Sequence, residues 1–175
     1  MNNRRQIIWN YGLMMGLSLV LLYGVLYALG EYNLGDQSSS NWGQMLVNFG
    51  MAVVFPLLAM LKLKSIQNGY IKLGAAFSSG WQVILIASII GSLWILVYAM
   101  ILDPSYQDKI IEAAYDEWAK QGLGDDQMEQ AESFTRMFTS PFMMAGMGIV
   151  SSALIGALIS LVLGLIVQKQ DPSEI

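Results

Sequence analysis

Four long runs without a charged residue dominate the pattern of hydrophobic and polar positions along this 175-residue chain. The runs cover residues 6–30, 37–61, 73–102 and 137–168. Each is longer than the roughly 20 residues that an α-helix needs to cross about 30 Å of hydrocarbon. A buried strand would end after about eight residues, and a helix in a soluble protein would show a polar face. The pattern therefore predicts an all-α membrane protein with four transmembrane helices.

The flanking residues place these helices at about 7–29, 42–61, 76–102 and 141–167, in a single transmembrane domain that covers residues 1–175. Ser140 and Pro141 mark the start of the fourth helix, as a cap followed by a proline at the first helical position. The first run begins like a secretory signal, but it is longer than 20 residues, whereas the apolar core of a signal has about 7–15 residues. We therefore expect a first helix that is not cleaved.

A polar segment, residues 103–139, separates the third and fourth runs. A structureless loop of this length would be unusual in a compact protein, so the segment should form helices of its own. Asp103 can cap a first helix with Pro104 at its first position, and Gly122 can end it. The segment therefore predicts an amphipathic helical hairpin between transmembrane helices three and four.

The predicted hairpin has an apolar side and an acidic side. On its first helix, Ile111, Tyr115 and Trp118 share one face at positions i, i+4 and i+7. A second helix is expected from Asp126, where Glu129 would complete a capping box. The functional interpretation is a lid, or a surface that docks a partner, above the bundle. The structural alternative is that the aromatic side packs on the bundle or the lipid interface while the acids stay in water.

The composition supports a membrane protein and narrows the possible chemistry. Hydrophobic residues make up 55% of the chain and charged residues 13%, whereas soluble domains have roughly 25% charged residues. The chain has no cysteine and no histidine, which excludes disulfides, thiolate nucleophiles, imidazole bases and nearly every zinc, haem or iron–sulfur site. We predict no cofactor and no bound metal. The net charge of −4 also argues against a nucleic-acid partner.

Few residues could support catalysis. The carboxylates of Asp116 and Glu117, and those of Asp125 and Asp126, are adjacent in sequence and so point in different directions on a helix. The chain has no Gly-x-Ser-x-Gly elbow, no phosphate-binding loop and no dinucleotide motif. We therefore expect that the protein is not an enzyme, and a membrane-embedded enzyme is the least favoured hypothesis.

The distribution of lysine and arginine predicts the orientation. Six would lie on the side of both chain termini: Arg4, Arg5, Lys62, Lys64, Lys72 and Lys169. Three would lie on the opposite side: Lys109, Lys120 and Arg136. Because short cytoplasmic segments carry the excess of basic residues, we expect both termini in the cytoplasm and the acidic hairpin outside it.

Small residues recur at every fourth position of the fourth run, a spacing typical of close packing between membrane helices. They are Gly148, Ser152, Gly156, Ser160 and Gly164. The first run has a broken version that begins with Gly12 and Gly16. These stripes predict helix–helix or homo-oligomer contacts, and the alternative is that they line a narrow polar path. None of the four runs contains an ionisable Asp, Glu, Lys, Arg or His, which argues against proton-coupled transport through one subunit.

Three stretches of the chain carry a resemblance to a known family. They are "NYGLMMGL" in the first predicted helix, "AAFSSG" at the start of the third, and "LDPSYQDKIIEAAYDEWAKQGLGDDQMEQA" with a following "SP" before the fourth. With them, nearly the whole chain resembles a family of small Bacteroidota membrane proteins catalogued as domain of unknown function number forty-one ninety-nine. The resemblance implies a four-helix protein of a bacterial inner membrane and no established activity, ligand or catalytic residue.

These observations predict a non-enzymatic structural, assembly or accessory subunit that lies in the lipid bilayer. Its partners would be a second copy of the chain or another membrane protein, bound through the small-residue stripes. The competing hypothesis is a component of a transporter or channel. Four helices are few for an internal pore, so such a component would form a path only as an oligomer or with partners.

Overall fold

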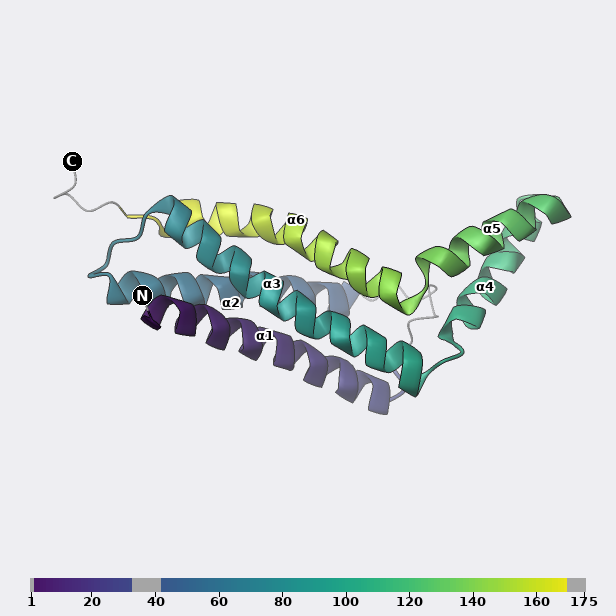
Figure 1. Ribbon diagram of the computed structural model, residues 1–175, viewed down its shortest axis with the longest axis horizontal. Helices are drawn as coiled ribbons and strands as arrows, with labels where there is room; N and C mark the ends of the chain where they lie inside the picture. Colours follow the sequence, from purple (N-terminus) through teal and green to yellow (C-terminus); the bar gives the residue numbers. More distant parts are fainter. Residues whose placement is uncertain (1, 33–41, 170–175) are drawn as a thin grey trace.

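The computed structural model describes residues 2–32 and 42–169, and it shows a four-helix bundle with a helical hairpin at one end (Figure 1). The bundle consists of α1 (Asn2–Ala28), α2 (Trp42–Ile66), α3 (Leu73–Val97) and α6 (Pro141–Val167). The hairpin consists of α4 (Tyr106–Lys120) and α5 (Asp125–Phe138), and a π-helical turn (Tyr98–Leu102) joins it to α3. The four helices of the bundle are long and apolar enough to cross a membrane, which confirms the predicted fold class.

Helix α3 is the central helix of the bundle, because α1 and α6 both pack along it (Figure 1). Three clusters of buried side chains lie along its length. The first joins α1, α2 and α3 around Val83, and the second joins α2, α3 and α6 around Leu63. The third lies at the hairpin end around Tyr98 and Tyr106. The core is therefore continuous with the base of the hairpin.

Glycines let α1 and α6 approach α3 closely. A Cβ atom on Gly156 of α6 would lie 2.8 Å from Cγ2 of Ile84, and one on Gly12 of α1 would lie 2.7 Å from Cβ of Ile86. Both distances are shorter than real Cβ contacts, so no larger residue fits without a shift of the helices. Close packing of this kind holds helices together where lipid removes the hydrophobic driving force between them.

Large apolar side chains cover the outer faces of the bundle. Leu21 of α1 is 70% exposed, Leu46 of α2 is 67% exposed and Ile166 of α6 is 72% exposed. In water such a surface would favour aggregation or partner binding, whereas in a membrane lipid tails cover it. The exposure pattern therefore agrees with insertion of all four long helices.

Three helices continue past their predicted ends, and one of them, α3, begins at Leu73 rather than at residue 76. Helix α1 already begins at Asn2, and α2 extends to Ile66 although its charge-free run ends at Leu61. The charged Lys64 is accommodated because its Nζ donates a hydrogen bond of 2.7 Å to the carbonyl oxygen of Val167 at the end of α6. A cation at a helix C-terminus is favourable, so the lysine extends the helix without a buried unpaired charge.

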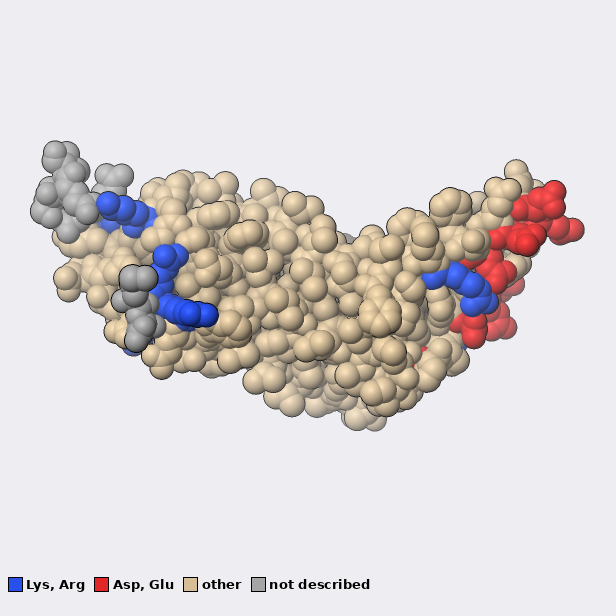
Figure 2. Space-filling model, in the orientation of Figure 1, with Lys and Arg blue, Asp and Glu red and all other residues tan. Residues whose placement is uncertain are grey.

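Charges are separated along the long axis of the molecule (Figure 2). Basic side chains gather at the end where α1 begins and α6 ends, and acidic side chains gather on the hairpin at the opposite end. Two backbone hydrogen bonds of 2.9 and 3.0 Å between Ile71 and Lys169 close the basic end. The molecule is therefore strongly dipolar across its apolar middle.

Candidate functional site: the acidic hairpin

The hairpin of α4 and α5 extends away from the bundle and touches it only at its base (Figure 1). Its buried residues are Tyr106, Ile110 and Ile111, all in the first two turns of α4, and α5 has no buried residue. Phe134 and Phe138 of α5 are 62% and 47% exposed. The aromatic side of α5 is therefore not folded onto the bundle, which was one of the two alternatives for a purely structural hairpin.

Asp103 organises the junction between the bundle and the hairpin. Its carboxylate accepts hydrogen bonds from the Tyr98 hydroxyl at 3.3 Å, from the Ser105 hydroxyl at 2.8 Å and from Lys109 Nζ at 2.8 and 3.0 Å. Partial burial alone would raise the pKa of Asp103. This pKa nevertheless lies below its usual value, because Lys109, Ser105 and Tyr98 donate hydrogen bonds to the carboxylate and Lys109 adds a positive charge. The junction is therefore anchored by an ionised carboxylate.

The predicted helix caps of the hairpin were wrong at both starting points. Asp103 does not cap α4, because the residue at the N-cap position is Ser105 and Pro104 lies before the helix. Helix α5 begins at Asp125, where Gly124 is the N-cap, rather than at Asp126. Half of a capping box forms there, because Gln127 Oε1 accepts a 3.2 Å hydrogen bond from the Gly124 amide while Gly124 has no side chain to return one.

Other features of the hairpin agree with the expectation from the sequence. Gly122 follows α4 with φ of +75°, the left-handed conformation that favours glycine after a helix. Ile111 is buried at the base of α4, and the rings of Tyr115 and Trp118 lie 5.3 Å apart further along it. The apolar face of α4 therefore runs from the bundle toward the tip.

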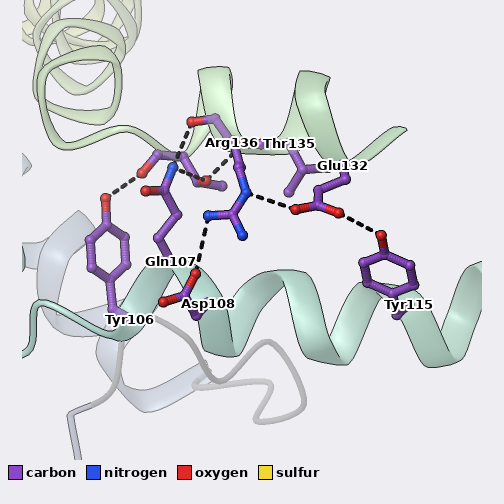
Figure 3. A network of polar contacts seen from close by, with 8 residues as sticks. Tyr106, Gln107, Asp108, Tyr115, Glu132, Thr135 and Arg136 are labelled. Atoms are coloured by element: carbon purple, nitrogen blue, oxygen red, sulfur yellow. Dashed lines mark hydrogen bonds and ion pairs between the residues drawn. The ribbon is translucent and has the colours of Figure 1, made fainter. Parts of the chain in front are cut away.

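A polar network holds α4 and α5 together, as Figure 3 shows. Arg136 of α5 donates from Nε to Glu132 at 2.8 Å and from Nη1 to Asp108 of α4 at 3.1 Å. The other oxygen of Glu132 accepts a hydrogen bond from the Tyr115 hydroxyl. The hydrogen bonds from Tyr115 and Arg136 lower the pKa of Glu132, while the same bonds raise the pKa values of Tyr115 and Arg136.

Two further side chains fasten the end of α5 to the base of α4 (Figure 3). Gln107 Nε2 donates to the carbonyl oxygen of Arg136 at 2.6 Å and to Thr139 Oγ1 at 3.2 Å. The Tyr106 hydroxyl donates to the carbonyl oxygen of Thr139. These contacts between α4 and α5 were not predicted from the sequence. The residue that could have indicated them is Arg136, which is the only basic residue of α5 and lies four residues after Glu132.

The bracing leaves an acidic surface on the hairpin. Its three basic residues are all engaged: Lys109 with Asp103, Lys120 with Glu117, and Arg136 with Glu132 and Asp108. Five exposed acids pair with no basic side chain in the part of the chain that the structure describes: Glu112, Asp116, Asp125, Asp126 and Glu129. The exposed surface of the hairpin therefore carries five unneutralised carboxylates, two on α4 and three in the first turns of α5.

The small-residue stripes lie inside the bundle. A Cβ atom on Gly16 would meet Ile90 of α3 at 2.6 Å, and one on Gly164 would meet the backbone nitrogen of Phe77 of α3 at 3.4 Å. The other members also face α3 or a groove beside it: Gly12, Gly148, Ser152, Gly156 and Ser160. Contacts within one chain thus occupy the stripe residues that we assigned to helix–helix or homo-oligomer packing.

Neither the hairpin nor the bundle assembles an evident chemical site. Among residues 2–32 and 42–169, no group of three acidic, histidine or cysteine side chains comes together to hold a metal ion. Each carboxylate of the hairpin network is engaged by a basic side chain, and the remaining acids are dispersed over an exposed surface.

Four long apolar helices, with a short turn between α2 and α3 at one end and an acidic hairpin between α3 and α6 at the other, define a class of protein: a multi-pass α-helical membrane protein. Residues 10–169 match a single family over almost the whole chain. The chain belongs to this family, which is described as a protein of unknown function (DUF4199). The membership agrees with the resemblance found in the sequence and brings no activity with it. No curated protein and no solved structure matches the chain.

Proposed function

We propose that the protein is a non-enzymatic accessory subunit of a bacterial inner-membrane assembly, and that its hairpin binds a basic partner outside the cytoplasm. The observation that carries this proposal is the acidic surface of the hairpin, where five exposed carboxylates pair with no basic side chain among the described residues. Carboxylates gathered on one surface repel each other, and a basic surface that docks there relieves this repulsion.

The bracing of the hairpin supports a binding role. Arg136 and Gln107 tie α5 to α4, and Asp103 ties α4 to the bundle. A partner that binds a preorganised surface does not have to order it, so less of the binding free energy is lost.

The distribution of charge supports the proposed orientation. Six basic residues belong to the segments at one end of the bundle, from Arg4 at the start of α1 to Lys169 after α6. Basic residues favour the cytoplasmic side, which would leave the hairpin in the extracytoplasmic space. The family resemblance to Bacteroidota membrane proteins supports the inner membrane as the location.

Photocrosslinking in native membranes tests the proposal. A photoreactive amino acid at Gln121, an exposed position just after α4, should capture one discrete partner, which mass spectrometry identifies. The matched control carries it at Leu158 of α6, which is 67% exposed on the bundle and should capture mainly lipid. Capture of a protein from Leu158 alone would contradict a docking role for the hairpin.

Binding of the purified partner provides the quantitative test. Added salt should weaken binding, because the attraction of exposed charges is screened beyond about 8 Å at physiological ionic strength. The double variant Asp125→Lys/Asp126→Lys should bind at least roughly tenfold more weakly, since like charges now oppose each other. The control Lys62→Glu, at the other end of the molecule, should bind normally. If neither added salt nor charge reversal changes the affinity, the acidic surface is not the binding site.

A further inference from the structure

A groove with a volume of about 440 Å³ lies in the hairpin half of the bundle. All four long helices and Tyr32 line it. Its lining residues Met45 and Phe49 of α2 and Ile155 of α6 are each more than half exposed, so the groove opens on the outer surface where α2 and α6 flank it. Its volume falls within the range of about 300–1,000 Å³ that is typical of small-molecule sites.

Small residues create the space. Gly91 of α3 lines the groove, and a Cβ atom on it would have no other atom within 4 Å. A Cβ on Gly148 of α6 would make only ordinary contacts, the nearest at 3.8 Å from Ser92 Oγ. Glycines at these two positions are therefore not needed for close helix packing, in contrast to Gly156. They keep a volume open in the bundle.

The groove has the dimensions and polarity of half a bilayer. On α3 it runs from Ile84 to Ile95, twelve residues that extend over about 16 Å of helix. This is close to half of the roughly 30 Å hydrocarbon core. Its deep end near Ile84 is apolar, and its end near the hairpin carries the polar side chains of Tyr23 and Asn48. An amphiphile in the leaflet on the hairpin side would enter with its polar head group toward the hairpin and its apolar chain toward Ile84, which matches the polarity of the groove.

Two polar atoms of groove-lining residues are buried without a hydrogen-bond partner among the described residues: Asn48 Oδ1, an acceptor, and Trp94 Nε1, a donor. Asn48 Nδ2 donates a 2.6 Å hydrogen bond to the Tyr23 hydroxyl, but Asn48 Oδ1 is buried with no hydrogen bond. An unsatisfied buried acceptor is costly, so the site favours a molecule that brings a donor. No charged side chain of the described residues lines the groove, so an uncharged head group fits best.

We propose that this groove binds one molecule of a long-chain acylglycerol from the membrane leaflet on the hairpin side. The acyl chain lies along α3 toward Ile84, and a glycerol hydroxyl donates a hydrogen bond to Asn48 Oδ1. The apolar walls select the chain, and the amide oxygen selects a head group with a hydroxyl. The site is independent of the acidic hairpin, so a result that rejects the proposed docking function does not reject this site, and the reverse also holds.

Photolabelling of the purified protein in phosphatidylcholine nanodiscs tests occupancy. The probe is a monoacylglycerol with a diazirine in the middle of its chain, and mass spectrometry maps the labelled positions. Labelling should concentrate on residues 84–95 and 148–159, and Gly91→Leu should reduce it at least fivefold by filling the groove. The matched control is Gly146→Leu on α6, where a Cβ also meets nothing within 4 Å but which does not line the groove.

Labelling that is spread evenly over the exposed faces of the bundle, or that survives Gly91→Leu unchanged, would overturn the site. Thermal unfolding of both leucine variants shows that they fold. A second probe tests the head group: the methyl ester of the same fatty acid has the chain and carbonyl but no hydroxyl. The native protein should label roughly threefold to tenfold less with the ester, and Asn48→Leu should remove this difference. Equal labelling of the native protein by both probes would overturn the hydroxyl contact.

Discussion

The Tyr115 hydroxyl on α4 donates a hydrogen bond to Glu132 on α5, across 17 positions of sequence. The second oxygen of this carboxylate accepts from Arg136, which in turn reaches Asp108 on α4. Because α5 has no buried residue, these polar contacts take the place of an apolar core between the two helices. Charge-assisted hydrogen bonds are stronger than neutral ones, and they make the hairpin sensitive to protonation.

Removal of the shared carboxylate charge should loosen the hairpin. Glu132→Gln keeps the shape of the side chain but weakens its bonds with Tyr115 and Arg136, so amide hydrogen exchange should become several-fold faster in α4 and α5. Exchange in α3 and α6 should not change, because the hairpin touches the bundle only at its base. Asp116→Asn is the matched control, since this exposed carboxylate has no basic partner among the described residues. Equal effects of the two variants would contradict a bracing role for Glu132.

The hairpin should be most stable between mildly acidic and mildly alkaline pH. The pKa of Glu132 is lowered from 4.5, so its contribution is complete above about pH 4.5 and is lost as the pH falls through the lowered value. The pKa of Tyr115 is raised from 10.0, so its contribution is complete below about pH 10 and is lost as the pH rises through the raised value. Protection factors of the α4 amides, corrected for intrinsic exchange, should fall on both sides.

The variant Tyr115→Phe separates the two limbs of this pH dependence. In this variant the protection factors should no longer fall at alkaline pH, because the titrating hydroxyl is absent. They should still fall at acidic pH, because Arg136 and Glu132 remain paired. If Tyr115→Phe loses as much protection at alkaline pH as the native protein does, then another group causes that loss.

Arginine at position 136 should not be replaceable by lysine. Its guanidinium uses Nε for Glu132 and Nη1 for Asp108, and a single ammonium group cannot reproduce this fork. Arg136→Lys should therefore increase hydrogen exchange in the hairpin almost as much as Arg136→Met. Lys120→Met is the control, because Lys120 forms only an exposed ion pair of 3.6 Å with Glu117, a type of contact worth little. Full protection in Arg136→Lys would show that charge alone suffices.

The membrane-spanning part of this fold was predictable from the sequence because its signals are local. Helix α6 spans Pro141–Val167 as expected, since Ser140 and Pro141 start it and the apolar run ends close to Val167. Gly122 likewise marks the end of α4 through its own backbone preference. Each of these elements follows from residues that are neighbours along the chain.

The candidate sites were much less predictable because they depend on contacts between distant residues. The pair of Arg136 and Asp108 joins positions 28 residues apart, and no short motif announces it. Asn48 meets Tyr23 on another helix, 25 positions away, and no sequence pattern pairs these two residues. The spacing alone does not distinguish the stripe glycines either, because Gly156 packs against α3 while Gly148, two turns earlier in the stripe, leaves space.

Two glycines of α6 should respond very differently to the same substitution. In Gly156→Leu the new side chain would collide with Ile84, and overpacking of this kind costs typically 1–3 kcal/mol. In Gly146→Leu the new side chain points into open space, so the melting temperature in detergent should stay near that of the native protein. Both variants gain the same helix propensity, so the difference between them isolates the contact with α3. Equal melting temperatures would exclude close packing at Gly156.

The orientation across the membrane should follow the basic end of the molecule. The chain has no cysteine, so single cysteines can be introduced without background. Ser65→Cys lies at the exposed end of α2 beside Lys64, and Ser133→Cys lies on the exposed surface of α5. A membrane-impermeant maleimide applied to spheroplasts should label position 133 at once and position 65 only after the membrane is permeabilised. Because basic segments are retained on the cytoplasmic side during insertion, labelling of position 65 in intact spheroplasts would reverse the topology and place the acidic hairpin in the cytoplasm.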